Sequence, residues 1–195
     1  MICSPPTIDP ADCPAVSETV SRTLGASETL CHVLPTIPLA IWCVSMSEPL
    51  VFMMGKFEAK IPTDRRYLES HVWVQPAGAV LRVGFTSYAV RLLQDVYFLD
   101  WQIDPDTPVR RKQAIGEIES SKAVSTLYAP ADGRVLRFNE ALLNDPSLIN
   151  ADNHDRGWLY ELTTEATLLS PQEYIQSLEA GWEKTERMLK SQYNE

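Results

Sequence analysis

The residue best placed to carry chemistry in this sequence is Lys122, one of only six lysines in the 195 residues. It ends a polar stretch, Glu119–Lys122, that separates two runs of strand-like composition, residues 114–118 and 124–128. A lysine at the tip of such a hairpin projects its amine away from the sheet, so an enzyme could acylate this amine and ignore the others. Amide formation would remove the charge and leave a long, thin arm. The local pattern alone also fits an ordinary solvated turn lysine, which is commoner.

Other patterns typical of enzymes are scarce in the sequence. Its three histidines have neither the helical spacing nor the cysteine partners of a metal site, and its eight glycines form no phosphate-binding loop. No Gly-x-Ser-x-Gly elbow is present. Glu117 and Glu119 lie two apart on a predicted strand, hence on one face, where they could act as an acid–base pair. Solvated carboxylates beside a turn are commoner, so the sequence disfavours a conventional enzyme and favours a binding or carrier role.

The elements that must position Lys122 are mostly short strands. Residues 71–74 and 79–84 form strand patterns around a Pro–Gly turn, and Thr86 with Ser87 can cap a helix over residues 88–93. Further strands are predicted over residues 96–99, 134–138 and 158–162. Short strands with turns roughly every eight to twelve residues predict a small sandwich or flattened barrel.

The C-terminal region changes to a helical pattern. Ser170-Pro-Gln-Glu173 has the form of a capping box with proline at the first helical position. Large apolar residues then recur every three or four positions, at Tyr174, Ile175, Leu178, Trp182 and Leu189. This spacing predicts one amphipathic helix packed against the sheet.

Composition and charge limit the function further. The chain is 45% apolar and 22% charged, and its formal net charge is −9. An acidic chain repels phosphate backbones, which disfavours nucleic-acid binding, and no run of about 18 apolar residues predicts a membrane-spanning helix. All four cysteines lie before residue 46, in a proline-rich, aperiodic stretch. We therefore expect residues 1–45 to be a disordered or non-native N-terminal extension, with Met46 as an alternative start. Residues 46–195 are then expected to form the domain. We expect the protein to be cytoplasmic.

The residues on both sides of Lys122 form an extended motif. Residues 119–130 read Glu-Ser-Ser-Lys-Ala-Val-Ser-Thr-Leu-Tyr-Ala-Pro. This segment resembles the lipoyl-lysine segment of the glycine cleavage system H-protein family, which shows Glu-Ser-Val-Lys-Ala-x-Ser-x-Leu-Tyr-x-Pro. The resemblance covers about residues 61–190, through Ile61-Pro62-x-Asp64, His71-x-Trp73-Val74, Gly84-Phe85-Thr86-x-Tyr88-Ala89 and Gly157-Trp158-Leu159.

The resemblance implies a mainly β fold, the barrel-sandwich hybrid of lipoyl and biotinyl domains, with short helices and a C-terminal amphipathic helix. It also implies covalent lipoate on Lys122 as an N6-lipoyl-lysine, with Glu119, Ser121 and Ala123 as flanking recognition residues. A biotin carrier would show Met-Lys-Met at the modified lysine. With a lipoyl group attached, the disulfide would lie on the order of 14 Å from the backbone. Neither a catalytic residue nor a metal is implied.

A member of this family would be a carrier and not itself an enzyme. The resemblance implies that the arm takes an aminomethyl group from a pyridoxal-phosphate glycine decarboxylase and presents it to a tetrahydrofolate-dependent aminomethyltransferase. A dihydrolipoyl dehydrogenase would then reoxidise the dithiol. The remaining partner would be a lipoate-attaching enzyme, for which Glu117 and Glu119 are candidate recognition charges. An acidic surface suits docking on basic patches of such partners.

The sequence departs from the family pattern in several places. The family's His-Glu-Trp is His71-Val72-Trp73 here, and residues 46–60 form an insertion-like segment. These departures leave two other interpretations open. One is an H-like lipoyl carrier for another process, such as lipoate relay to 2-oxoacid dehydrogenases or sulfur oxidation. The other is an unmodified β-sandwich interaction module that has kept the fold and lost the arm.

Overall fold

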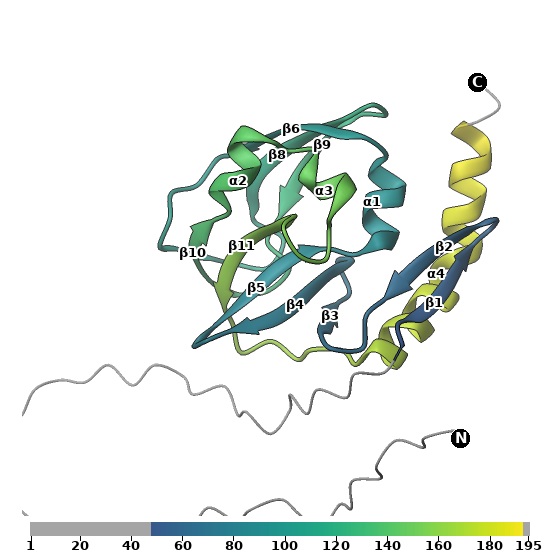
Figure 1. Ribbon diagram of the computed structural model, residues 1–195, viewed down its shortest axis with the longest axis horizontal. Helices are drawn as coiled ribbons and strands as arrows, with labels where there is room; N and C mark the ends of the chain where they lie inside the picture. Colours follow the sequence, from purple (N-terminus) through teal and green to yellow (C-terminus); the bar gives the residue numbers. More distant parts are fainter. Residues whose placement is uncertain (1–47, 193–195) are drawn as a thin grey trace, which may run out of the picture. The chain divides into compact units, whose positions relative to one another are not determined.

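The computed structural model describes residues 48–192, with side chains up to Arg187 (Figure 1). The expectation for residues 1–45 falls outside this range and stays a prediction. The strands are β1 (Leu50–Met54), β2 (Phe57–Ile61), β3 (Arg66–Leu68), β4 (Val72–Ala77), β5 (Val80–Phe85), β6 (Val96–Trp101), β7 (Thr107–Val109), β8 (Ala114–Ser120), β9 (Val124–Tyr128), β10 (Gly133–Phe138) and β11 (Trp158–Thr163). The helices are α1 (Ser87–Leu93), α2 (Glu140–Asn144), α3 (Leu148–Ala151) and α4 (Pro171–Gln192).

Three antiparallel sheets organise the strands. One has six strands in the order β3-β4-β5-β11-β10-β7, one has three in the order β6-β8-β9, and β1 and β2 pair only with each other. The six-stranded and three-stranded sheets share one core, to which Val74 and Val83 contribute from the first sheet and Leu99 and Ile118 from the second. The two sheets therefore form the mainly β sandwich that the strand pattern predicts.

The predicted strand–turn–strand over residues 71–84 is present, but its turn is tighter than expected. β4 continues to Ala77, because Pro76 still pairs with Leu81 of β5. The chain reverses at Gly78, whose φ of 72° is a left-handed conformation that glycine adopts without a Cβ clash. The turn is shorter than predicted because β4 includes Pro76, where the sequence predicts the turn.

The helices begin where their capping residues predict. Thr86 caps α1, since its hydroxyl accepts a hydrogen bond from the Ala89 N–H at 3.2 Å. Ser170 and Glu173 form the expected capping box of α4: the Glu173 carboxylate accepts from the Ser170 N–H at 2.7 Å, and the Ser170 hydroxyl accepts from the Glu173 N–H at 3.2 Å. Within residues 48–192, none of the helices is long and apolar enough to cross a membrane.

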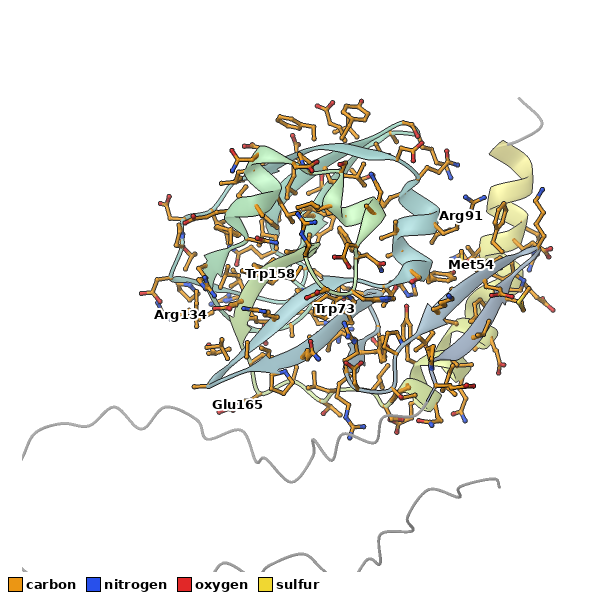
Figure 2. The ribbon with its side chains drawn as sticks, in the orientation of Figure 1. Met54, Trp73, Arg91, Arg134, Trp158 and Glu165 are labelled. Carbon is orange, nitrogen blue, oxygen red and sulfur yellow. The ribbon has the colours of Figure 1, made fainter. Side chains whose placement is uncertain are left out.

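A second core lies between α1, α4 and the β1–β2 hairpin, which runs alongside α4 (Figure 1). Phe52 of β1 makes edge contacts with Tyr88 and Trp182, at ring-centroid distances of 5.9 and 5.6 Å. Arg91 projects from α1 toward the hairpin (Figure 2), and its guanidinium lies 3.4 Å from the centroid of the Phe57 ring. The other buried side chains of the hairpin are Met54, Ala59 and Ile61. The insertion-like segment of the sequence therefore forms a hairpin that covers two helices.

Candidate functional site

Lys122 lies at the tip of the β8–β9 hairpin. β8 runs two residues further than expected, to Ser120, so the residues between the strands are Ser121–Ala123. The Lys122 side chain is exposed, and within residues 48–192 no hydrogen bond or ion pair holds its ammonium group. Nothing in the described part of the chain therefore competes with a reagent or enzyme for this amine.

The backbone of the tip is fixed although the lysine side chain is free. Ser120, only 5% exposed, donates hydrogen bonds from its N–H and its hydroxyl to the Ala123 carbonyl, both at 3.1 Å. The same hydroxyl accepts from the Ala123 N–H at 3.3 Å. The Ser121 N–H donates to the Asp95 carbonyl at 2.9 Å, which ties the tip to the segment before β6. These bonds hold the Lys122 Cα in one place.

An acidic and partly apolar surface surrounds the tip on the outer face of the three-stranded sheet. Phe98, Glu119 and Val124 are aligned across β6, β8 and β9, and the Phe98 and Val124 side chains are 47% and 62% exposed. Asp100 and Glu117 form the next pair along the same two strands. Within the described residues, these three carboxylates have no cationic partner. The surface therefore suits a basic partner.

An apolar pocket of about 280 Å³ lies beside the β8–β9 hairpin. β9 contributes residues 125–128 to its wall, β4 and β5 contribute Val72 and Phe85, and α1 contributes Leu92. The first of the β9 residues is three positions after Lys122, about 10 Å along a strand. An acylated lysine arm on the order of 14 Å long reaches that far.

His71 lines the same pocket and belongs to a buried hydrogen-bond network. Its Nδ1 lies 3.1 Å from the Tyr174 hydroxyl, which lies 3.1 Å from the Thr86 hydroxyl. The Thr86 hydroxyl donates to the His71 carbonyl at 3.0 Å. Burial lowers the pKa of His71, which keeps the imidazole neutral at neutral pH. The backbone of His71 is left-handed, with φ 62°.

A separate polar cluster fastens the segment before β11 to the six-stranded sheet. Arg65 is 8% exposed; it donates to both oxygens of Asp64 at 2.8 and 2.9 Å and to the His154 carbonyl at 2.7 Å. Its guanidinium lies 4.8 Å from the centroid of the Trp73 ring. Burial, with the Arg65 charge second, lowers the pKa of His154 to about 4, and the Arg65 hydrogen bond lowers the pKa of Asp64. This cluster is internally satisfied and has a structural role.

A larger, open groove of about 620 Å³ lies at the opposite end of β9 from Lys122. Three of its charged residues are paired: the Arg111 guanidinium with Glu69 at 2.8 Å, and the Arg111 N–H, which donates to the Asp132 carboxylate at 2.7 Å. Across residues 48–192, no group of three or more histidine, cysteine or acidic side chains could hold a metal ion. The free amine and the apolar pocket therefore make the β8–β9 hairpin the candidate site.

Two facing antiparallel sheets that do not close into a barrel define a lipoyl-type, barrel-sandwich domain. The family model described as "Glycine cleavage H-protein" matches residues 65–190. A probable glycine cleavage system H protein of Natronomonas pharaonis is 42% identical over 118 residues, 58% of this chain and 93% of the relative. The H protein of Thermobifida fusca is 38% identical over 122 residues, 61% of this chain and 96% of the relative.

A solved structure agrees with these sequence matches. The crystal structure of a glycine cleavage system H protein from Mycobacterium marinum has a TM-score of 0.52 and 37% identity to this chain, covering 60% of this chain and 97% of that one. The chain belongs to the glycine cleavage H-protein family, whose members are the lipoyl carriers of the glycine cleavage system and are not themselves catalytic. The fold class and the carrier function expected from the sequence are thereby confirmed, and the family's partners belong to that system.

The predicted site residues lie together, whereas two parts of the site were not predicted. Glu119, Ser121 and Ala123 flank Lys122 on the same hairpin. The role of Ser120 was missed, although a serine beside a predicted turn is a known signal for local side-chain to backbone hydrogen bonds. The pocket was also missed, because its walls come from β4, β5, α1, β8 and β9 and leave no local motif.

Proposed function

We propose that Lys122 carries the lipoyl group as an N6-lipoyl-lysine. The observation that carries the proposal is an exposed, unpartnered amine on a turn whose backbone is hydrogen-bonded on both sides. When attached, lipoate supplies a redox-active dithiol that accepts and releases a one-carbon amine unit. The chain's own part is to fix the root of the arm and to offer its apolar length the pocket beside β9. These residues fit a thin, apolar acyl group.

We also propose that the lipoate-attaching enzyme reads the surface beside the lysine. Glu119, which is half-buried, Ser121 and Ala123 are the flanking recognition residues, and Glu117 adds an exposed carboxylate on the same face. Carboxylates without an intramolecular partner attract a basic enzyme surface at little desolvation cost to this chain. Reversing both charges, Glu117→Lys with Glu119→Lys, is expected to slow lipoylation. Full lipoylation of this double variant at the wild-type rate would contradict the assignment.

The specific partners follow from the carrier role. We propose that the arm moves between a pyridoxal-phosphate glycine decarboxylase, a tetrahydrofolate-dependent aminomethyltransferase and a dihydrolipoyl dehydrogenase. Phe98 and Val124 give these enzymes an apolar contact near the root of the arm, and the carboxylates around them favour basic docking patches. Encounter rates with all three enzymes are therefore expected to fall as salt rises.

The modification is tested by intact-mass spectrometry of protein from lipoate-replete cells. Wild-type protein is expected to gain the mass of one lipoyl group, and Lys122→Arg is expected to gain none. Lys56→Arg is the matched control, since Lys56 lies at the turn of the other hairpin, and it is expected to keep the adduct. An adduct that survives in Lys122→Arg would move the site to another lysine.

The reaction is tested with the lipoylated protein and a glycine decarboxylase. Exchange of bicarbonate into the carboxyl group of glycine is expected with wild-type protein and not with Lys122→Arg. A fully lipoylated wild-type protein that is inert in this exchange would favour a carrier for lipoate relay or sulfur oxidation. Wild-type protein without any adduct would favour the unmodified interaction module.

A further inference from the structure

One edge of the β1–β2 hairpin has no backbone partner in the described part of the chain. β1 pairs with β2 alone, and no backbone hydrogen bond within residues 48–192 is made at the other edge of β1. β2 differs, because α1 packs against it and Arg91 of α1 lies over the Phe57 ring. Edge strands of stable proteins are usually protected by charged side chains, prolines or bulges. Between Leu50 and Met54, β1 has none of these.

The turn of the hairpin determines which backbone groups of β1 face the open edge. A two-residue turn connects the strands, so the pair that flanks it, Met54 and Phe57, is hydrogen-bonded through the backbone. Hydrogen-bonded and non-hydrogen-bonded pairs alternate along an antiparallel ladder. Phe52 therefore also bonds to β2, whereas the N–H and carbonyl groups of Val51 and Met53 point to the open edge. The side chains of these last two residues are 48% and 50% exposed.

The open edge of β1 is complementary to the same edge of a second copy. Antiparallel pairing centred on Phe52 places Val51 of each copy opposite Met53 of the other, and the backbone groups that face the edge then bond to each other. The same register brings Glu48 of each copy to the end of the strand that holds Lys56 of the other, and both side chains are exposed. Apolar pairs therefore lie at the centre of the pairing and opposite charges at its two ends.

The neighbouring strand β2 extends this complementarity on the half-exposed face. Lys60 lies beside Val51, and Glu58 lies beside Met53. Two paired copies form a sheet in the order β2-β1-β1-β2, so each row across its outer face reads lysine, valine, methionine and glutamate. The apolar side chains are then flanked by opposite charges, which is the usual arrangement of an apolar interface centre with a polar rim. Neither row places like charges side by side.

We propose that two copies of the chain form a two-fold dimer by pairing their β1 strands into one four-stranded antiparallel sheet. The association closes at two copies, because each uses its β1 edge and β2 packs against α1. The strand has only five residues, so the dimer is expected to be reversible and to depend on protein concentration. The hairpin precedes the family match of residues 65–190 and belongs to a different sheet from β8 and β9 (Figure 1). The dimer therefore does not involve the hairpin of Lys122, and the proposal does not depend on lipoylation.

The first experiment measures the mass of the full chain by sedimentation over roughly a thousandfold range of concentration. The wild-type mass is expected to rise from 21.9 kDa toward twice this value. Met53→Pro removes an N–H that faces the open edge and no bond to β2, so this variant is expected to stay monomeric. Met53→Ala is the matched control: it keeps the N–H, loses apolar contact, and is expected to dimerise about tenfold more weakly than wild type. A wild-type mass that stays at 21.9 kDa at every concentration overturns the proposal.

A charge swap tests the register of the two strands. Glu48→Lys or Lys56→Glu alone places like charges at both ends of the pairing, and each is expected to weaken the dimer about fivefold. The double variant restores opposite charges and is expected to dimerise like wild type. A double variant that dimerises no better than either single variant contradicts the pairing of β1 with β1.

Hydrogen exchange on the wild-type protein completes the test without any variant. The amides of Val51 and Met53 are expected to exchange more slowly as the concentration rises, because dimerisation pairs them. Protection of both amides in a chain that stays monomeric would mean that another part of the same chain occupies the edge. Fast exchange at every concentration would mean that the edge stays open. Either result overturns the proposal, and the same measurement on Lys122→Arg shows that the result is independent of the proposed modification.

Discussion

The two hairpins β8–β9 and β1–β2 each place a lysine at the turn, but the surroundings of the two lysines differ. Lys122 on β8–β9 is exposed and, within the described residues, has no partner. Lys56 on β1–β2 has its Nζ 5.4 Å from the centroid of the Phe57 ring, which also stacks with Arg91. A lysine at a hairpin turn is therefore not by itself evidence of a modification site. Both hairpins have such a lysine, and the two differ in whether neighbouring side chains contact it.

The hairpins also differ in how their backbones are held. β8 is a central strand, bonded to β6 on one side and β9 on the other, and its turn is tied to Asp95. β1 and β2 bond only to each other, so side-chain packing on α1 and α4 keeps them in place. The family match, residues 65–190, includes the first hairpin and not the second. The proposed arm therefore lies on the hairpin held by backbone bonds, and the hairpin held by packing covers two helices.

The largest expected effect tests whether the β1–β2 hairpin stabilises the fold without affecting modification of Lys122. Phe52→Ala removes the ring that joins Tyr88 to Trp182 in the second core, and is expected to cost about 3–5 kcal/mol in the free energy of unfolding. Lys122 should still become fully lipoylated in the fraction that folds. Urea denaturation and intact mass measure the two quantities. Val51→Ala, on the half-exposed face of the same strand, is the control and should cost less than about 1 kcal/mol.

Substitution of one glycine in each hairpin tests whether β8–β9 is held mainly by backbone hydrogen bonds and β1–β2 mainly by side-chain packing. A Cβ at Gly116 would collide with the Asp100 carbonyl, so Gly116→Ala must push β8 away from β6, at an expected cost of about 3 kcal/mol. Gly55 turns β1 into β2 at φ 65° with open space around it, so Gly55→Ala should cost only about 1–2 kcal/mol from the left-handed backbone. Equal losses in thermal or urea unfolding would mean that the two hairpins are not held differently.

The sequence predicts the elements of the main sandwich well because each has a local signal. The capping residues Thr86 and Ser170 and the turn at Gly78 all appear where the pattern places them. The β1–β2 hairpin had no such signal. Its first strand, Leu-Val-Phe-Met-Met over residues 50–54, is apolar at every position, although alternate side chains are buried and exposed in the fold. Without alternation, a period of two cannot be read from the residue types.

The candidate site also has one part that the sequence predicts and one part that it does not. Lys122 and its neighbours form a continuous motif, so both the turn and the resemblance were visible in the sequence. The pocket depends on which segments the fold brings together, and His71 lies 51 positions before Lys122 in the chain. Its ring is held in turn by the hydroxyl of Tyr174, from the last helix. No pattern of spacing along the chain contains that information, because it arises only from tertiary packing.

Mild acid tests whether the two hairpins lose their structure together. Folding lowers the pKa of His154 from about 6.5 to about 4, so the folded state favours the neutral imidazole. That contribution is complete above pH 6.5 and is lost as pH falls toward 4, with an expected total on the order of 3 kcal/mol. His154→Gln should flatten this part of the stability curve. Trp182 fluorescence reports on the second core, and a transition there at higher pH than loss of the β-sheet signal would show that the hairpins are uncoupled.

The smallest effect concerns the turn that would present the proposed arm. Ser120→Ala removes the hydroxyl that bonds Ala123 on both its N–H and its carbonyl, and is expected to cost about 1 kcal/mol and to slow lipoylation of Lys122 a few-fold, because the turn samples more conformations. Ser177→Ala is the control, because Ser177 lies on the exposed side of α4 and, among the described residues, its hydroxyl has no hydrogen-bond partner. A time course of intact mass with the lipoate-attaching enzyme measures both rates. Equal rates for the two variants would mean that exposure of the amine alone, without the fixed turn, is what the enzyme requires.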